Sequence, residues 1–485
     1  MGGARRTLRR FQQVLPTHPI ADATTRRAVV MMVVVSAFAL ALVVSSITVA
    51  LPSLARGLAL DALLLSWVPL VFLMSSAATV LAFGRLADMY GRKRIFAYGT
   101  VGILVSSIAL ALAPNGPVLI VLRALQGIAA AMLYATQVAI LSSVFPREQR
   151  GRMIGLMAAA IYFGLTCGPV AGGYAIEHFG WRAAFLVHVP LTLLVLAGIP
   201  FVRGEWAADE RGHFDGAGAA LYAGAILAIV GGSALLPRAA GLPIMAAGAG
   251  LLWAFFRYEH GRAHPLFDVT LFYTNRVFTL SSLAALLMYA TTFSILVLAS
   301  LYLQYLKGLS PTRAGFVMLA QPLMVAMFSP IAGRLSDHLE PRLIATAGMA
   351  VTCAGLVMLA ALTPASALSR VTVCLLTTGF GFALFASPNV NAIMSTLRPN
   401  QYGVAGGAVA TMRVLGQVSS MGLVATSFAL TIGPVEITPA VYPALAEALE
   451  LSFSIAAALC VPAMFCSLAR GKLHRDRGET LRRRD

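Results

Sequence analysis

The sequence predicts an all-α polytopic membrane protein with 14 transmembrane helices. The composition is strongly apolar, because 59% of the residues are hydrophobic, 11% are charged and the mean hydropathy is +0.81. Apolar stretches of about 20 residues, long enough for a helix to cross a bilayer, recur along the whole chain. The few charged residues gather in the tails and in short loops between these stretches, which leaves no room for a soluble domain.

Fourteen apolar segments, separated by charged or Pro/Gly-rich breaks, are the predicted spans. The first is longer than the apolar region of a cleaved signal peptide, so we interpret it as a span. Short loops between the segments indicate one compact bundle. The predicted spans are 28–52, 62–83, 95–113, 117–142, 153–176, 183–202, 216–236, 240–256, 277–305, 312–332, 343–362, 369–395, 404–430 and 447–469.

Basic residues predict the orientation of the chain. If there are fourteen spans, 28 of the 36 Lys and Arg residues fall in the two tails and in every second loop, whereas six fall on the other side. Cytoplasmic loops carry the basic excess, so we expect a protein of the inner (plasma) membrane with both termini cytoplasmic. The net charge of +17 therefore reflects membrane topology, and we expect the lipid bilayer, not nucleic acid, as its partner.

A charged stretch occurs twice. "GRLADMYGRKRI" at 84–95 joins spans 2 and 3, and "GRLSDHLEPRLI" at 333–344 joins spans 10 and 11. Internal repeats are typical of transporters whose substrate site lies between two halves. We expect each copy to act as a cytoplasmic gating loop, in which Asp88 accepts hydrogen bonds from a neighbouring helix start or pairs with an arginine. The predicted gating residues are Gly84, Asp88, Gly91, Arg92, Gly333 and Asp337.

The repeat also predicts the domain organisation, with each copy linking the second and third helix of its half. Spans 7 and 8 are then an insertion between two six-helix halves. The predicted division is a basic cytoplasmic N-tail at 1–27, an N-terminal half at 28–202, inserted helices with cytoplasmic linkers at 203–275, a C-terminal half at 276–469 and a basic cytoplasmic C-tail at 470–485.

These stretches resemble the major facilitator superfamily, and the number of spans resembles its fourteen-span drug:proton antiporters. "GRLADMYGRK" is similar to the family's loop between helices 2 and 3, and "RALQGIAAA" at 123–131 to its fourth-helix motif. The segment "GLMAAAIYFGLTCGPVAGG" resembles the antiporter motif of helix 5, which implies an exporter. The matching residues of that motif are Gly155, Gly164, Gly168, Pro169, Gly172 and Gly173.

The same motif has a physical interpretation without the resemblance. Gly164, Gly168 and Gly172 fall on one helix face, and this small-residue spacing lets another helix pack backbone to backbone. Pro169 removes a backbone hydrogen bond and bends the helix. We therefore expect a kinked, closely packed helix between the halves that helps to seal one end of a pathway.

Two arginines, Arg123 and Arg413, fall inside predicted spans, where a charged group is costly and usually functional. We expect both to face a central cavity and to bind an anion or a carboxylate, although Arg413 has two alternatives, pairing with the Asp88 loop or extending to the membrane surface. The other predicted cavity residues are Gln126, Tyr134, Gln137, Tyr162, His188 and Gln417. Further lining candidates are Phe163, Tyr289, Phe293, Tyr302, Gln304, Phe385 and Asn389. For these residues, and for Tyr134, Gln137 and Tyr162, plain helix packing is at least as good an explanation.

Proton coupling needs a titratable group, and here the chain departs from the family. The resemblance implies an aspartate early in the first helix, but Val43 stands at that place in "LVVSSITVALP". No acidic residue lies deep in a predicted span. The remaining proton-coupling candidates are His188, Asp88, Glu177 and Glu450; alternatively, the protein moves an anionic or lipid-like substrate without the usual acid.

The sequence therefore predicts a secondary active exporter of amphipathic small molecules, driven by protons through alternating access. We expect no cofactor, no metal site, no enzymatic activity and a monomer. The five cysteines lack metal-ligand spacing, and there is no phosphate-binding loop for an ATP-driven pump. A channel is disfavoured by the duplicated loop, and a non-transporting receptor or scaffold on the same fold stays a remote alternative.

Overall fold

The computed structural model describes residues 23–202, 204–206, 214–236, 238–260, 262, 266, 270–397 and 402–471. These residues form helices and no β-strand, apart from an isolated bridge between Asp61 and Glu436. Helices satisfy their own backbone hydrogen bonds, which a chain in lipid requires. The predicted tails lie outside the described residues, except for the short stretches next to the first and last helices.

The N-terminal helices reproduce the first six predicted spans with two differences. The first is that α3 continues to Tyr90, so most of the expected gating loop is helix. The second is that the sixth span is broken into three short helices, where one helix at 183–202 was expected. The elements are α2 (Ala23–Leu58), α3 (Ala62–Tyr90), α4 (Arg92–Ala111), α5 (Gly116–Val144), α6 (Arg147–Phe179), η1 (Trp181–Phe185), α7 (Val189–Gly198) and η2 (Ile199–Phe201).

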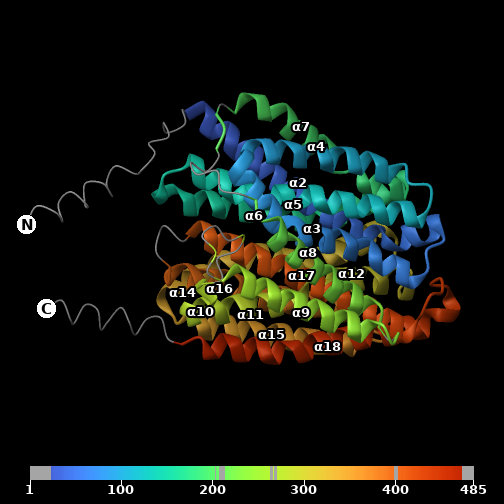
Figure 1. The fold of residues 1–485 in the computed structure, drawn as a ribbon. Helices are drawn as coiled ribbons and strands as arrows, with labels where there is room; N and C mark the ends of the chain where they lie inside the picture. The colour runs from blue at the N-terminus through green and yellow to red at the C-terminus, as the bar shows by residue number, and fades with distance from the viewer. Residues whose placement is uncertain are drawn as a thin grey trace, which may run out of the picture.

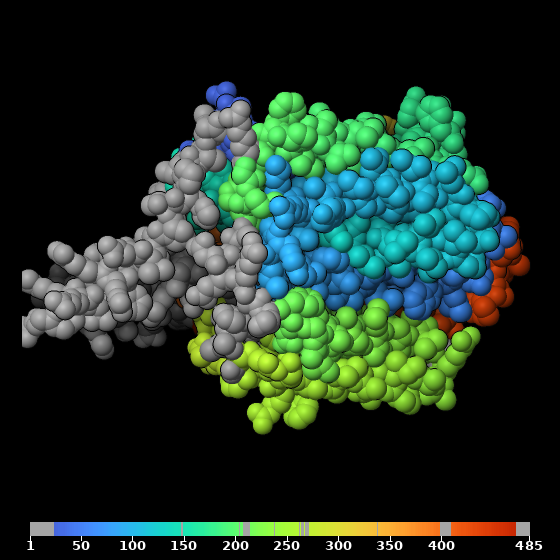
Figure 2. All heavy atoms as spheres, turned by 45° about the horizontal axis from the view of Figure 1, so that its top comes forward, coloured from blue at the N-terminus to red at the C-terminus, as the bar shows by residue number. Residues whose placement is uncertain are grey.

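The inserted segment forms a helical hairpin followed by a short helix. Asp215 caps the first of these helices by accepting a hydrogen bond from the backbone N–H of Gly218 at 2.9 Å. The hairpin contacts both α3 and the penultimate long helix of the chain, and Figure 2 shows it beside the N-terminal helices on one face. The elements are α8 (Gly216–Ala234), α9 (Gly241–Glu259) and α10 (Thr270–Thr274).

The C-terminal helices complete the bundle. Two of the predicted spans, the ninth and the tenth, are each divided into consecutive helices, and the ninth ends in a turn of π-helix. The elements are α11 (Arg276–Thr292), α12 (Ser294–Leu301), η3 (Tyr302–Leu306), α13 (Pro311–Met318), α14 (Ala320–His338), α15 (Pro341–Ala360), α16 (Leu368–Ser395), α17 (Tyr402–Thr431), η5 (Pro439–Val441) and α18 (Tyr442–Ala469).

Thirteen of the fourteen predicted spans are long and apolar enough to cross a membrane within the described residues. The exception is the eighth predicted span, α9, which is helical but ends in the polar sequence "RYE". The N-terminal and C-terminal helices form two neighbouring groups (Figure 1). We call the end of the bundle where α2 begins and α18 ends the tail end, because both lie there in Figure 1; the other end is the opposite end.

Candidate functional site

Arg123 is buried among the N-terminal helices. Its side chain is 1% exposed. Nε donates to the carbonyl oxygen of Val68 at 3.1 Å, and Nη1 donates to Oε1 of Gln126 at 2.6 Å. The guanidinium also lies 4.5 Å from the ring centroid of Phe72. The charge of Arg123 is therefore held by groups of α3 and α5, away from the C-terminal helices.

A hydrogen-bonded line continues from Gln126 to His188. The amide nitrogen of Gln126 donates to Oγ of Ser107 at 2.8 Å, and this oxygen lies 2.8 Å from Nε2 of His188. The single hydroxyl proton of Ser107 has an acceptor in the carbonyl oxygen of Ile103 at 2.6 Å. In that arrangement His188 carries its proton on Nε2 and donates it to Ser107.

Nδ1 of His188 is then an unprotonated nitrogen. It is buried and has no hydrogen-bond partner within the described structure. Sequence reasoning did not single out Ser107, which holds this tautomer, because nothing in the sequence separates it from its neighbour Ser106. Both serines bond helix carbonyls, and helix rotation alone turns Ser107 toward His188.

A second group of polar side chains lies where the two groups of helices meet. Tyr134 of α5 and Tyr162 of α6 come from the N-terminal side, and Tyr289 of α11 and Arg413 of α17 come from the C-terminal side. The guanidinium carbon of Arg413 lies 5.9 Å from the ring centroid of Tyr134, and Tyr162 and Tyr289 interact through their hydroxyl groups. We call these four residues the tyrosine–arginine cluster.

The tyrosine–arginine cluster suits an aromatic molecule that is neutral or anionic. All four side chains are partly accessible, and the ring of Phe382 packs against that of Tyr289 at 5.4 Å in a T-shaped contact. Helices α5, α11 and α17 carry no acidic residue, and α6 carries acids only at its ends. The positive charge of Arg413 is therefore not neutralised by a carboxylate of these helices.

Two of the predicted cavity glutamines, Gln137 and Gln417, lie in different places. Gln417 follows Arg413 by one turn of α17 and is partly accessible. Gln137 is buried inside the N-terminal helices, where its Nε2 donates to Oγ of Ser36 at 3.1 Å. The structure thus brings Tyr134, Tyr162 and Arg413 together, but places Gln137 outside this group.

The glycine-rich face of α6 packs against α2. A methyl group added at Gly164 would lie 2.7 Å from the carbonyl oxygen of Phe38, and one added at Gly172 would lie 2.8 Å from Cβ of Ser46; Gly168 faces Ser45. These contacts allow the close backbone approach that the spacing predicts. Gly155, by contrast, has no atom within 4 Å of the position of an added methyl group.

The adjacent face of α6 joins the two groups of helices at the opposite end. A methyl group at Gly173 would lie 2.5 Å from the carbonyl oxygen of Pro311, and Gly315 packs directly on the carbonyl oxygen of Pro169. Oε2 of Glu177 accepts a hydrogen bond from the backbone N–H of Thr312 at 3.1 Å. Helix α6 therefore seals against the start of α13.

Two further hydrogen bonds hold the same end closed. Nε2 of Gln304 donates to the carbonyl oxygen of Val49 at 2.9 Å, and the backbone N–H of Ala62 donates to the carbonyl oxygen of Val435 at 2.9 Å. The described hydrogen bonds between the N-terminal and C-terminal helices, including the one from Thr312 to Glu177, lie at this end. The structure is thus closed at the opposite end.

Asp88 pairs within its own stretch in this conformation. Its Oδ1 accepts from Nη2 of Arg92 at 2.7 Å, and Nη1 of Arg92 donates to Oγ of Ser143 at 2.5 Å. Gly91 has a φ of 112°, which favours glycine, at the junction of α3 and α4. The predicted gating residue Gly84 lies inside α3 on an uncovered face, where no atom lies within 4 Å of an added methyl group.

The second copy of the repeated stretch differs at its glycine. A methyl group at Gly333 would lie 2.6 Å from Oγ of Ser387 on α16, so α14 and α16 approach closely there. The side chain of Asp337 lies outside the described structure. Glycine at the matching position therefore packs within a half in one copy and is uncovered in the other.

The remaining proton-coupling candidates are engaged or exposed. Asp88 is 37% exposed and paired with Arg92, Glu177 accepts from α13, and Glu450 lies on an exposed face of α18. Val43, which stands where the family resemblance implies an acid, is 3% exposed in the core. His188 is the candidate with a buried nitrogen that has no partner in the described structure.

Arg470 was counted among the tail charges, but the structure buries it. The side chain is 1% exposed, and Nη1 donates to Oδ1 of Asn389 at 2.7 Å and to Oγ of Ser281 at 3.1 Å. Burial lowers the pKa of its guanidinium to about 10, so it stays a cation at neutral pH. It fixes the end of α18 against α11 and α16. Among the described residues, no group of three His, Cys, Asp or Glu side chains is placed to hold a metal ion.

A bundle of two helical groups with a polar cluster between them is typical of membrane transporters built from two related halves. The sequence profile of the Major Facilitator Superfamily matches residues 33–421. The chain belongs to this superfamily of secondary transporters and is not an enzyme.

Its relatives include proteins named for small-molecule transport. It is 30% identical over 420 residues to the riboflavin transporter RibZ of Clostridioides difficile, covering 86% of this chain and 91% of the relative. It is 30% identical over 379 residues to the multidrug resistance protein Stp of Mycobacterium tuberculosis, covering 76% and 70%. A tetracenomycin C resistance and export protein of Streptomyces glaucescens is 26% identical over 401 residues, covering 80% and 73%.

Proposed function

We propose that the protein exports small amphipathic molecules across the inner (plasma) membrane by alternating access, driven by protons. The tyrosine–arginine cluster carries this proposal, because it unites side chains from both groups of helices around partly accessible surface. The basic excess in the tails and alternate loops makes the tail end cytoplasmic. With the opposite end closed, the described conformation then faces the cytoplasm, ready to receive a substrate.

The substrate class is a planar aromatic molecule that is neutral or carries negative charge. Tyrosine rings stack on aromatic surfaces, and their hydroxyls bond polar substituents. Arg413 attracts acceptor or anionic groups, whereas a lipophilic cation would meet an unneutralised positive charge. The names of the riboflavin and tetracenomycin C transporters among the relatives support an aromatic substrate. An anionic or lipid-like substrate moved without proton coupling is the alternative.

Coupling to protons is assigned to His188. Its Nδ1 is buried without a partner, and the Ser107–Gln126 line connects it to Arg123. Histidine titrates closest to physiological pH among the side chains. Protonation would place a second positive charge in the same network as Arg123, and this unfavourable state provides the free-energy difference that drives a conformational change.

Transport by reconstituted protein tests the proposal. In proteoliposomes with an imposed pH gradient, an amphipathic aromatic anion should dissipate the gradient, whereas a lipophilic cation of similar size should not. The Arg413→Gln variant should bind the anion about tenfold more weakly, because a desolvated cation–aromatic or ionic contact is worth about 1–2 kcal/mol.

Arg182→Gln is the matched control. Arg182 is also stacked on an aromatic ring, at 4.3 Å from the centroid of Trp181, but lies beyond the cluster. Dissipation of the pH gradient by the lipophilic cation alone would overturn the assignment of an aromatic neutral or anionic substrate. Absence of flux for every compound, together with a co-purifying protein, would favour the receptor or scaffold.

A further inference from the structure

The chain that leaves the N-terminal half for the inserted hairpin lies against the first copy of the repeated stretch. We call residues 204–206 of this connection the linker segment. The side chain of Trp206 is 9% exposed, and that of Val202, just before the segment, is fully buried in the core. Between them Gly204 turns the chain with a φ of 91°. The linker segment is therefore fixed on both sides.

The linker segment supplies hydrogen-bond acceptors at the start of α4. The first N–H groups of a helix have no partner inside the helix, and Gly91, which precedes α4, has no side chain to accept from them. The carbonyl oxygen of Trp206 accepts from the backbone N–H of Arg92 at 2.9 Å, and Oε1 of Glu205 accepts from that of Lys93 at 2.8 Å. Glu205 thus caps α4 from a distant part of the chain.

The carboxylate of Glu205 is oriented by its surroundings. Its Oε1 also accepts from the backbone N–H of Trp206 at 3.1 Å. Nζ of Lys93 donates to the carbonyl oxygen of Val202 at 2.5 Å, which holds the same turn of α4 from another side. Oε2 lies 3.8 Å from Nε of Arg94, whose side chain is 69% exposed, so this ion pair contributes little. Hydrogen bonds to the backbone are therefore the main link.

Gly91 makes room for this carboxylate. A methyl group added there would lie 2.5 Å from Cδ of Glu205, closer than non-bonded carbon atoms approach. The missing side chain at Gly91 therefore permits both the positive φ of the junction and the position of Glu205. The sequence indicates the first of these but not the second, because Glu205 is distant along the chain.

The capped turn carries the arginine that pairs with Asp88. The backbone N–H of Arg92 is held by Trp206, while its Nε donates to Oδ1 of Asp88 at 2.9 Å and its Nη1 to Oγ of Ser143 at 2.5 Å. If the turn unwound, the guanidinium would lose the backbone position from which it reaches both α3 and α5. The linker segment thus acts on Asp88 through Arg92.

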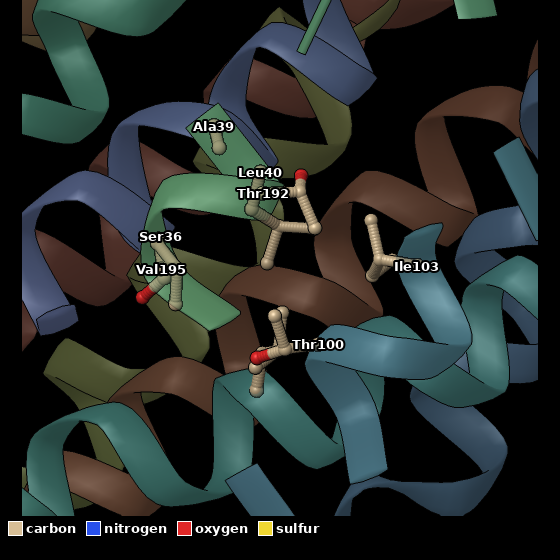
Figure 3. Close-up of a pocket in the computed structure, with 8 residues that line it drawn as sticks. Ser36, Ala39, Leu40, Thr100, Ile103, Thr192 and Val195 are labelled. Atoms are coloured by element: carbon tan, nitrogen blue, oxygen red, sulfur yellow. The ribbon is translucent and has the colours of Figure 1, made fainter. Parts of the chain in front are cut away.

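The middle of α4 is held in a different way, by close packing on its neighbours. A methyl group at Gly99 would lie 2.8 Å from Cβ of Met132, and one at Gly102 would lie 2.7 Å from Cβ of Ala129, both on α5. Where α4 meets α2, α5 and α7, a cavity of about 10 Å³ remains, lined mostly by apolar side chains (Figure 3). Loss of the Glu205 cap would therefore loosen the first turn of α4 and leave the rest of the helix in place.

The second copy of the repeated stretch has a counterpart of this contact with the charges reversed. Glu340 stands where the first copy has Gly91, and Pro341, which has no N–H, stands where it has Arg92. The residue after the last helix of this half is Arg470; burial lowers the pKa of its guanidinium, and the nearby charge of Glu340 raises it. In each half a charged residue that follows the sixth helix thus lies beside the copy of that half, but the second copy has no arginine four residues after its aspartate.

We propose that Glu205 is a positioning residue for the first copy of the repeated stretch: it caps α4 and so holds Arg92 where it presents Asp88 for closing the tail end. This inference rests on the proposed alternating-access function, in which the tail end must close before the opposite end opens. The group that acts is the hydrogen-bond acceptor of Glu205, not its charge, which separates this role from that of an ion pair.

Replacement of Glu205 by alanine and by glutamine tests this role in the full-length protein. Glu205→Ala removes the acceptor, so hydrogen–deuterium exchange at the first turn of α4 should become about fivefold faster, as expected for a lost helix cap. Transport of anilinonaphthalene sulfonate, an amphipathic aromatic anion, should slow by a similar factor in proteoliposomes, with its Kd unchanged. Glu205→Gln keeps an oxygen acceptor and should match the unmodified protein in each measurement.

A double variant tests whether Glu205 acts through Asp88. In an Asp88→Asn background, Glu205→Ala should cause no further loss of turnover, because the effects of two residues that act through one contact are not additive. A cysteine placed at Thr312 gives a measurement that needs no substrate. A membrane-impermeant maleimide should label it more slowly in Glu205→Ala, because the opposite end opens less often when the tail end fails to close.

Asn115→Ala is the matched control. Asn115 is an exposed residue that caps α5 by accepting from the backbone N–H of Val118 at 3.0 Å, and it lies at the opposite end of the bundle. This variant also loses a helix cap of the N-terminal half. Its turnover, and the labelling of a cysteine at Thr312, should nevertheless equal those of the unmodified protein.

The outcomes separate the cap, the positioning role and the proposed export. Unchanged exchange in Glu205→Ala would overturn the cap, and faster exchange with unchanged turnover and labelling would overturn the positioning role. Equal losses in Glu205→Gln and Glu205→Ala would mean that the charge acts, which also contradicts the proposal. If the unmodified protein does not transport the anion but labelling still depends on Glu205, the proposed export of this anion fails and the positioning role stands.

Discussion

At the scale of single residues, Ser107 connects the two parts of the N-terminal polar line. It accepts from Gln126, contacts His188 and donates to its own helix, so it uses the full hydrogen-bonding capacity of a hydroxyl group. Because each partner is buried, loss of this oxygen would leave an amide nitrogen and an imidazole nitrogen without partners. Its importance thus comes from the polar groups it satisfies and from the tautomer it imposes on His188.

We therefore expect Ser107→Ala to destabilise the protein and to impair proton coupling. Each buried donor left unsatisfied costs about 1–3 kcal/mol, which a thermal unfolding scan in detergent would detect as a lower Tm. Ser106→Ala is the matched control, because the neighbouring hydroxyl bonds only carbonyls of α4. Equal effects of the two substitutions would show that the Ser107 contacts have no special role.

At the scale of helices, α6 has two packing faces that contact different helices. One face, with Gly164 and Gly172, packs closely against α2 within the N-terminal group. The other, with Pro169 and Gly173, meets α13 across the boundary between the groups. The spacing of the glycines predicted close packing, but not which helix each face meets, because helix rotation within the bundle is set by all the neighbours together.

The Gly173→Ala variant should open the opposite end of the bundle, which is closed in this structure. The added methyl group would lie 2.5 Å from the carbonyl oxygen of Pro311, so α6 and α13 must separate for it to fit. We expect a cysteine placed at Thr312 to react faster with a membrane-impermeant maleimide in this background. Gly155→Ala is the control, since its methyl group would enter open space; similar labelling rates in both backgrounds would contradict the assignment of this seal.

At the scale of the whole molecule, hydropathy was sufficient to predict all fourteen helical segments, because length and apolarity are what a bilayer demands. It did not predict the break of the sixth span next to His188, where Pro190 lies in the first turn of α7 and has no backbone N–H to continue the preceding helix. Nor did it predict that Arg123 would be enclosed within one group while Arg413 lies between the two. Both arginines look alike in sequence, and only the packing of α3 against α5 separates them.

The alternating-access cycle requires the closed and open ends to exchange, and Asp88 offers a test. Here Asp88 pairs with Arg92 at a partly exposed site, where such a pair contributes only about 0–1 kcal/mol. If its main role is to hold the tail end closed in the other conformation, Asp88→Asn should lower turnover several-fold, with stability and substrate Kd nearly unchanged.

Arg94→Gln is the control for that experiment, because Arg94 is 69% exposed and lies 3.8 Å from Glu205 within the same surface region. Turnover of this variant should equal that of the unmodified protein. An equal loss of substrate binding and turnover in Asp88→Asn would instead mean that Asp88 shapes the conformation described here. The repeated stretch would then stabilise the state that receives substrate, not the state that releases it.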